Sequence, residues 1–320
     1  MSQGPVLVAE VVRSGFVEGR HRGSLVVLDP AGSVRLGRGD VLAPMFPRSS
    51  NKLMQAAGMV SAGLALTGEH LALAAASHSG ESFHVAAVAE ILAGAGLDES
   101  ALQTPPDLPY GEAAREAALR RGDLPSRIAM NCSGKHAAML ATCVANGWSL
   151  PDYLDRSHPV QQATRDAVER LTGEPAGAVG TDGCGAPVLA VSLLGLARAF
   201  GRSVLAAPEA PERRVADAMR AWPAYVAGTG RDVTDLMVAV PGLLAKDGAE
   251  GVFACALPDG TSFAVKVEDG ADRARQVVAA AVLSWLGVPA PVLDRLATIP
   301  LLGGGRVVGE IRVAPGLLPT

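Results

Sequence analysis

Strand-forming segments lie at both ends of the chain, and segments with helical spacing fill its middle. Within residues 5–50, short β-branched runs alternate with Gly-rich and Asp-Pro-Ala-Gly turns, a pattern typical of an antiparallel meander. Strand patterns return at 251–257, 261–267 and 306–313, and a helix is predicted at 271–286. This order predicts an α/β fold in which both termini build one antiparallel sheet and a helical cluster packs on it.

The middle of the chain supplies the helical cluster. Helical spacing of apolar residues predicts helices at 50–66, 83–95, 137–146, 158–172, 188–200 and 211–227. A chain of 320 residues can bury one large hydrophobic core. We therefore expect a single domain over 1–320, which could divide into a sheet lobe from both termini and a closely packed helical lobe over about 50–250.

Composition excludes several classes of partner. The net charge of −4 leaves no basic surface, and three Trp and three Tyr give few rings for base stacking, so we expect no nucleic-acid partner. The apolar run at 277–286 is too short to cross a membrane and is predicted to be a buried helix. Residues 1–5 lack a basic or apolar signal region, which favours a cytoplasmic location. Four cysteines in so long a chain do not make a disulfide framework.

Lysine is rare in this chain, although arginine is common. Of 28 basic residues only four are lysine: Lys52, Lys135, Lys246 and Lys266. An arginine side chain stays charged in a protein, whereas a buried lysine can lose its proton and act as a base or a metal ligand. Rare lysines in or beside polar loops therefore indicate a catalytic or metal-binding role. Lysines without such a role would be scattered over helix surfaces.

Ser49 and Lys52 form a Ser-x-x-Lys motif at the start of the first predicted helix. Residues i and i+3 share one face of a helix, so the Lys52 amine could accept the proton of the Ser49 hydroxyl if burial lowers its pKa. The helix N-terminus also offers free N–H groups to a developing oxyanion. The alternative is that Ser49 only caps the helix.

A second polar loop, Ser77-His78-Ser79-Gly80-Glu81, follows a short apolar segment. It gathers two hydroxyls, an imidazole and a carboxylate. The loop could pair a second serine with a distant lysine, or it could bind the charged ends of an amino acid. A polar turn that caps the next helix is the alternative.

Two cysteines lie in polar, Gly-containing loops, whereas the other two have apolar neighbours. Cys132 belongs to the polar loop at 131–136, and Cys184 to the Gly-rich loop at 180–187. Two thiolates joined by a nitrogen ligand, from Lys135 or His136, make a ligand set that selects zinc. A redox pair of the two cysteines is the alternative.

Taken together, these loops resemble the second family of bacterial L-asparaginases, the thermolabile or Rhizobium-type enzymes. Six ordered motifs over nearly the whole chain are far more specific than any one of them. The matching motifs are Arg13-Ser14-Gly15-Phe16-Val17-Glu18 with His21-Arg22-Gly23, Arg48-Ser49 with Lys52 and Gln55, Ser77-His78-Ser79-Gly80-Glu81 with His84, Asn131-Cys132-Ser133-Gly134-Lys135-His136, Asp182-Gly183-Cys184-Gly185-Ala186-Pro187, and Lys246-Asp247-Gly248-Ala249-Glu250-Gly251-Val252 with Lys266. Asp247 stands where the resemblance predicts an apolar or small residue.

The resemblance implies a fold like that of serine β-lactamases and penicillin-binding proteins, with two Ser-Lys pairs. These pairs map onto Ser49 with Lys52 and onto Ser77 with Lys266. Ser49 would attack the side-chain amide of L-asparagine, and water would then release L-aspartate from the acyl-enzyme after ammonia has left. The alternatives to Ser77 in the second pair are Ser79 and Ser82.

The resemblance also implies a zinc site held by Cys132, Lys135 and Cys184, with the role of zinc left open. Lysine binds zinc only as the neutral amine, so zinc occupancy should fall as the pH drops. A fixed cation beside the nucleophile suits the α-carboxylate of an amino acid. The residues expected to contact the substrate are Arg48, His78, Glu81, His136 and Asp182. A homodimer is a further expectation of the resemblance.

Other functions account for some of these features. A glutaminase or another Ser-Lys amide hydrolase would use the same pairs. A penicillin-recognising enzyme fits less well, because the chain has no Lys-Thr-Gly triad. A non-catalytic amino-acid-binding protein would not need the serines and lysines of every motif. A metal-dependent amidohydrolase would activate water on zinc, and it would survive Ser49→Ala.

Overall fold

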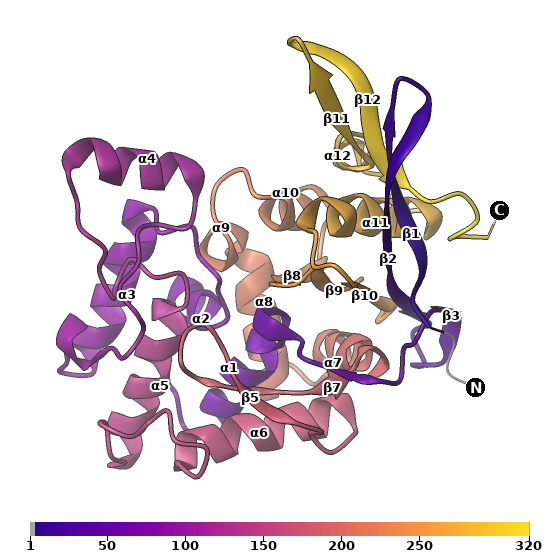
Figure 1. Ribbon diagram of the computed structural model, residues 1–320. Helices are drawn as coiled ribbons and strands as arrows, with labels where there is room; N and C mark the ends of the chain where they lie inside the picture. The colour runs from indigo at the N-terminus through magenta and orange to yellow at the C-terminus, as the bar shows by residue number, and fades with distance from the viewer. Residues whose placement is uncertain (1–3, 320) are drawn as a thin grey trace.

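An antiparallel sheet of eight strands organises the computed structural model, which describes residues 4–319 (Figure 1). Its strand order is β11-β12-β1-β2-β10-β9-β8, with β3 paired to β2. The strands are β1 (Val6–Arg13), β2 (Phe16–Leu28), β3 (Val34–Arg38), β8 (Leu244–Gly248), β9 (Val252–Ala256), β10 (Ser262–Val267), β11 (Thr298–Gly303) and β12 (Arg306–Val313). Because β1 pairs with β12 and β2 with β10, both ends of the chain build one sheet, as predicted.

Helices fill the segment between the two groups of strands and cover the sheet (Figure 1). They are α1 (Lys52–Ser61), α2 (Gly68–Ala74), α3 (Ser82–Gly94), α4 (Glu112–Arg121), α5 (Ser133–Asn146), α6 (Pro159–Thr172), α7 (Leu193–Leu205), α8 (Pro211–Ala221), α9 (Pro223–Val226), α10 (Asp232–Ala239), α11 (Asp272–Trp285) and α12 (Pro291–Leu296), with 3-10 turns η1 (Arg48–Asn51) and η2 (Glu99–Ala101). Two short strand pairs complete the fold: β4 (Pro44–Met45) with β7 (Val191–Ser192), and β5 (Val179–Thr181) with β6 (Pro187–Leu189).

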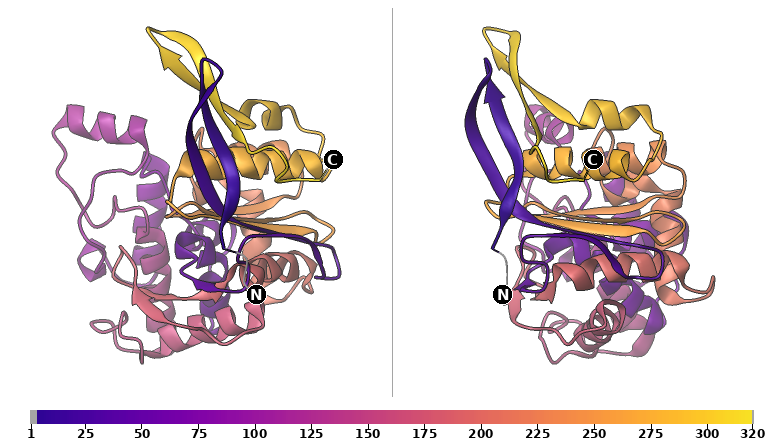
Figure 2. Two further views of the ribbon diagram at one scale, coloured as in Figure 1. Left: turned by 45° about the vertical axis from the view of Figure 1, so that its right-hand side comes forward. Right: turned by 90° about the vertical axis from the view of Figure 1, so that its right-hand side faces the viewer.

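The sheet lies between helices on its two faces (Figure 2). On one face α7 packs against β2, β9 and β10, and on the other α11 packs against β1, β10 and β12. The hairpins β1–β2 and β11–β12 extend together beyond this helical cover (Figure 2). The predicted α/β architecture, with a sheet from both termini and a helical cluster, is confirmed.

Small side chains allow the helices to pack closely. With aromatic residues at only 4%, the core is built largely from Ala, Val and Leu. At Gly58 of α1, an added Cβ would lie 2.5 Å from the carbonyl oxygen of Ala163 on α6. Glycine is therefore needed where α1, the helix that begins at Lys52, crosses α6.

Most predicted elements are confirmed, and the differences have local causes. The helix predicted at 188–200 begins only at Leu193, because the preceding residues form β6 and β7. The segment 211–227 divides into α8 and α9 at Pro223, which cannot continue the first helix. Helix α4 and strand β8 are among the elements that were not predicted, because each lies next to Gly and Pro turn signals.

The apolar run at 277–286 is a buried helical segment within and just after α11, as predicted. Within residues 4–319, no helix combines the length and apolar character that a membrane span requires. The prediction about a signal segment rests partly on residues 1–3, which lie outside the described residues.

Candidate active site

The Ser-x-x-Lys motif lies at the junction of η1 and α1. Arg48 has a positive φ of 51°, which turns the chain into η1, and its Nε donates to Asp182 Oδ1 at 2.8 Å. Ser49 is half-buried on this turn, whereas Lys52 is 1% exposed. The motif therefore places a partly accessible hydroxyl one turn before a buried amine.

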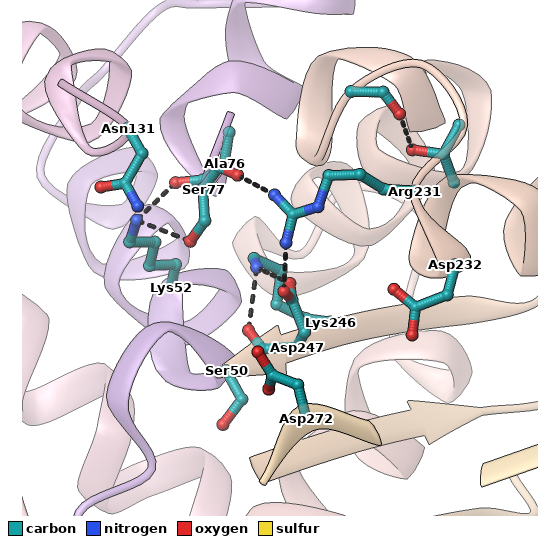
Figure 3. Close-up of polar contacts among 12 residues, drawn as sticks. Ser50, Lys52, Ala76, Ser77, Asn131, Arg231, Asp232, Lys246, Asp247 and Asp272 are labelled. Atoms are coloured by element: carbon teal, nitrogen blue, oxygen red, sulfur yellow. Dashed lines mark hydrogen bonds and ion pairs between the residues drawn. The ribbon is translucent and has the colours of Figure 1, made fainter. Parts of the chain in front are cut away.

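The Lys52 amine contacts Ser77 rather than Ser49 (Figure 3). Its Nζ lies 3.0 Å from Ser77 Oγ, 3.0 Å from Cys132 Sγ and 2.5 Å from the Ala76 carbonyl oxygen. Within residues 4–319, no hydrogen bond joins Ser49 to Lys52, so that predicted contact is not formed. A buried amine requires hydrogen-bond partners, and the segment after α2 together with the loop that carries Cys132 supplies them to the lysine side chain.

Ser77 follows the end of α2 and is held by its backbone. Its N–H donates to the Val226 carbonyl at 3.0 Å, and its carbonyl accepts from Arg231 Nη1 at 2.6 Å. The residue is 4% exposed. The loop thus fixes the Ser77 hydroxyl on the Lys52 amine.

The predicted contact between Ser77 and Lys266 is not formed within residues 4–319. Lys266 lies on β10, and its Nζ donates to the backbone carbonyls of Glu250, at 2.8 Å, and Val267. Strand β10 lies two strands in from the β8 edge of the sheet, so its lysine reaches the turn between β8 and β9 instead of the loop at 77–81.

Lys246 is the buried lysine that the prediction missed as a site residue. It lies on β8, the edge strand next to η1, and it is fully buried. Its Nζ donates to the Asp247 carbonyl at 2.9 Å and contacts the Asp247 carboxylate. Burial lowers the pKa of Lys246 to about 8, and nearby Lys52 and Arg231 act in the same direction against the attraction of Asp247.

Gly248 brings β8 against the Ser-x-x-Lys turn. An added Cβ there would lie 2.5 Å from the Pro47 carbonyl oxygen and 3.1 Å from the Ser50 nitrogen. The segment Lys246-Asp247-Gly248 therefore lies directly beside η1. The scarcity of lysine singles out Lys246 in the sequence. Its place beside η1 could not be predicted, because strand β8 was not predicted.

The Arg231 guanidinium joins the two halves of the site (Figure 3). It donates to the Ser77 carbonyl on one side and forms an ion pair with Asp247 on the other. Ser77 belongs to the helical cluster, and Asp247 to the sheet. Arg231 thus holds the Lys52–Ser77 contact and the Lys246–Asp247 pair in one polar group.

The predicted substrate-binding residues lie in three places, and two of them, His78 and Glu81, belong to the loop at 77–81. His78 is fully buried: its Nδ1 accepts from the Gly80 N–H at 3.2 Å, and its Nε2 lies 2.9 Å from Ser133 Oγ. Burial lowers the pKa of His78 well below its usual value, which suits a neutral ring. Glu81 caps α3 and accepts from the Thr229 N–H at 2.8 Å. Both side chains therefore hold the loop, and their contact with substrate stays a prediction.

Arg48 and Asp182 lie at the rim of the Ser49 turn and pair with each other. Arg48 also lies 3.8 Å from Glu250, on the turn that follows β8. The pair is partly exposed, with 26% of the Arg48 side chain and 12% of the Asp182 side chain accessible. Arg48 is thus positioned as a cation next to the Ser49 turn.

The three predicted metal ligands converge in the buried interior. Lys135 Nζ lies 3.3 Å from Cys184 Sγ, and Cys132 and Cys184 share one small buried cluster. Hydrogen bonding from Cys132, with the positive charge of Lys135, lowers the pKa of the Cys184 thiol. The sulfur of Cys184 is therefore suited to carry negative charge.

His136 lies at the same cluster. Its Nδ1 lies 2.7 Å from the Tyr153 hydroxyl, whereas its buried Nε2 has no hydrogen-bond partner among residues 4–319. Within the described residues, no group of three His, Cys, Asp or Glu side chains is arranged to hold a metal. The predicted ligand set depends on an amine from Lys135, and the orphaned His136 Nε2 is a donor that such a set could use.

The chain is similar to several solved structures at low sequence identity. These structures include Mglu in its tris and glutamate form (15% identity, 87% of this chain and 62% of that chain, TM-score 0.45) and Mglu in its native form (16% identity, 82% and 64%, TM-score 0.44). A β-lactamase from Mycobacterium bovis is also similar (16% identity, 82% and 94%, TM-score 0.44). The chain covers less than two thirds of the length of Mglu in the first two structures. No curated protein matches the chain.

A family model described as L-asparaginase II matches residues 9–313. The match includes every motif discussed above, from the first hairpin to the last strand. Because this region is almost the whole chain, the protein belongs to the L-asparaginase II family.

Proposed function

We propose that the protein hydrolyses the side-chain amide of L-asparagine to L-aspartate and ammonia through a serine acyl-enzyme. The observation that carries this proposal is the buried Lys52 amine, 3.0 Å from the Ser77 hydroxyl and one turn after Ser49. A buried lysine next to hydroxyl groups is the arrangement that activates a serine without histidine. Membership of the L-asparaginase II family supports the amide as substrate.

Ser49 is the proposed nucleophile, because a nucleophile has to meet the substrate. It is half-buried at the turn, whereas Ser77 is 4% exposed and held on Lys52. Catalytic hydrogen bonds often tighten only when substrate is bound, and the i, i+3 spacing leaves Lys52 within one turn of Ser49. Ser49 Oγ then attacks the amide carbon and its proton passes to Lys52, while Ser77 holds the amine in place.

Lys246 is the proposed base of the second half-reaction. The amide nitrogen leaves as ammonia with the proton that Lys52 took up, and the β-aspartyl ester of Ser49 remains. Water attacks this ester, Lys246 accepts the proton of the water and passes a proton to the departing Ser49 oxygen, and L-aspartate leaves. With a pKa of about 8, roughly a tenth of Lys246 is neutral at pH 7, whereas a lysine of ordinary pKa is almost wholly charged.

Cys132, Lys135 and Cys184 are the proposed ligands of a zinc ion, and His136 Nε2 is a further candidate ligand. The donor set suits zinc because it combines soft thiolates with nitrogen. When bound, the ion would supply a fixed positive charge beside Cys132, whose sulfur lies 3.0 Å from the Lys52 amine.

The test is ammonia release from L-asparagine, L-glutamine and D-asparagine by the zinc-loaded protein and four variants. We expect release from L-asparagine, near-complete loss in Ser49→Ala and Lys246→Met, and strong loss in Lys52→Met. Lys266→Met is the matched control, because the Lys266 amine donates to the backbone carbonyls of Glu250 and Val267, away from the loop at 77–81, and it should keep wild-type turnover. Faster release from L-glutamine would make the protein a glutaminase, and no release from any amide would leave an amino-acid-binding protein.

A further inference from the structure

Asp247 touches two cations with its two carboxylate oxygens (Figure 3). Oδ1 contacts Lys246 Nζ, and Oδ2 forms an ion pair with Arg231 Nη2. The residue is 8% exposed and lies on the edge strand β8, where the resemblance to asparaginases predicts an apolar or small side chain. A buried carboxylate at this position needs an explanation, because burying a charge is costly unless it is paired.

The charges around Lys246 are mainly positive. Lys52 of α1 and Arg231, which precedes α10, both act on Lys246, and Arg275 of α11 acts on Asp247. The two other nearby carboxylates are engaged by Arg275, which lies 2.8 Å from Asp232 and 3.4 Å from Asp272. Tyr110, on the connector before α4, also faces this group.

Asp247 is therefore the carboxylate that balances Lys246. Within residues 4–319, no other carboxylate lies within ion-pair distance of the Lys246 amine. Burial, Lys52 and Arg231 all favour the neutral amine, and only Asp247 acts strongly against them. Its contact also fixes where the amine lies, because the same carboxylate is anchored by Arg231 on its other oxygen.

We infer that Asp247 is a positioning residue that keeps the Lys246 amine protonated near neutral pH and so sets the lower pH limit of turnover. The inference rests on the proposed role of Lys246 as a base. Turnover requires neutral Lys246, so the carboxylate shifts activity toward alkaline pH. A family member with an apolar residue here would keep its activity at lower pH.

The experiment is the pH dependence of kcat for wild type, Asp247→Asn and Asp247→Glu. An opposite charge in direct contact raises the pKa of a lysine, so the acidic limb of Asp247→Asn should move to lower pH, by about one to three pH units. At a pH below the wild-type limb, the variant would then turn over about tenfold faster than wild type if its limb moves by one pH unit, and about a hundredfold faster if it moves by two. Asp247→Glu keeps the charge, so its limb should stay close to that of wild type.

Asp232→Asn is the matched control, because Asp232 pairs with Arg275 and does not touch Lys246. Its acidic limb should stay in place. A lower kcat for Asp247→Asn at every pH, with an unmoved limb, would show a merely structural role and would overturn the inference.

A second measurement tests the inference even if Asp247→Asn does not fold. It also distinguishes a failure of the inference from a failure of the proposed function. The chain has only four lysines, so isotopically labelled lysine gives four side-chain NMR signals in the intact wild-type protein. The Lys246 signal, identified by its absence in Lys246→Met, should be that of a protonated amine at pH 7. A neutral amine at pH 7 overturns the inference. Normal protonation without any ammonia release would instead count against the proposed function.

Discussion

The free energy of unfolding of the wild-type protein should change with pH because Lys246 titrates. This contribution should be missing in Lys246→Met. Burial lowers the pKa of this lysine from 10.5 to about 8 in the folded protein. The unfolded chain therefore binds more protons than the folded protein between pH 8 and 10.5. The destabilising effect of Lys246 is complete below pH 8, and it is relieved as the pH rises through this window.

The size of the effect follows from the two pKa values. The contribution of Lys246 to the free energy of unfolding should rise by about 2 kcal/mol between pH 8 and pH 10. Urea denaturation of both proteins at these two pH values measures it. Other groups titrate over the same range, but they are common to both proteins, so the difference between wild type and Lys246→Met isolates the lysine.

Lys266→Met serves as the control, because Lys266 is only partly buried and donates to backbone carbonyls. The wild type should gain about 2 kcal/mol relative to Lys246→Met from pH 8 to pH 10, and clearly less relative to Lys266→Met. A constant difference between wild type and Lys246→Met would refute the reasoning, because Lys246 would then have the same pKa in the folded and unfolded chains.

Three further predictions concern the neighbouring parts of the site. Ser77→Ala removes one partner of the buried Lys52 amine, so kcat should fall by about 10²–10⁴-fold and stability by about 1–3 kcal/mol, measured by ammonia release and denaturation. Lys135→Met should lower the zinc content measured by elemental analysis, whereas Cys143→Ser should not, because Cys143 lies outside the cluster of Cys132 and Cys184. Gly248→Ala should reduce kcat by displacing η1, whereas Gly94→Ala in α3, where an added Cβ meets nothing within 4 Å, should stabilise the protein by up to about 1 kcal/mol.

The overall architecture could be predicted because its signals are local. The period of apolar residues identifies α3, α6 and α11, and the β-branched run at the end of the chain identifies β12. Strand β8 has no such signal, because its five residues are all buried and two of them are charged. Its charged residues are paired by contacts with Arg231 and with each other, which only the tertiary structure supplies.

Local sequence signals predicted some residues of the candidate site, but not which of them contact one another. The rarity of lysine drew attention to all four lysines, but only Lys52, Lys135 and Lys266 were predicted as site residues, and Ser77 was paired with Lys266 instead of Lys52. Sequence spacing could not show that Lys52, rather than Lys266, contacts the loop at 77–81, because that contact depends on how α1 packs beside the loop after α2. Spacing also suggested a contact between Ser49 and Lys52, whereas burial directs the lysine toward Ser77.

Rapid quenching of the protein during turnover of L-asparagine, followed by peptide mass spectrometry, tests the proposed mechanism most directly. Lys246→Met should slow hydrolysis of the acyl-enzyme and so make the intermediate easier to trap. We predict an added aspartyl group on Ser49, and none in Ser49→Ala. An aspartyl group on Ser77, or turnover of L-asparagine with no modified serine, would contradict the assignment of Ser49 as the nucleophile.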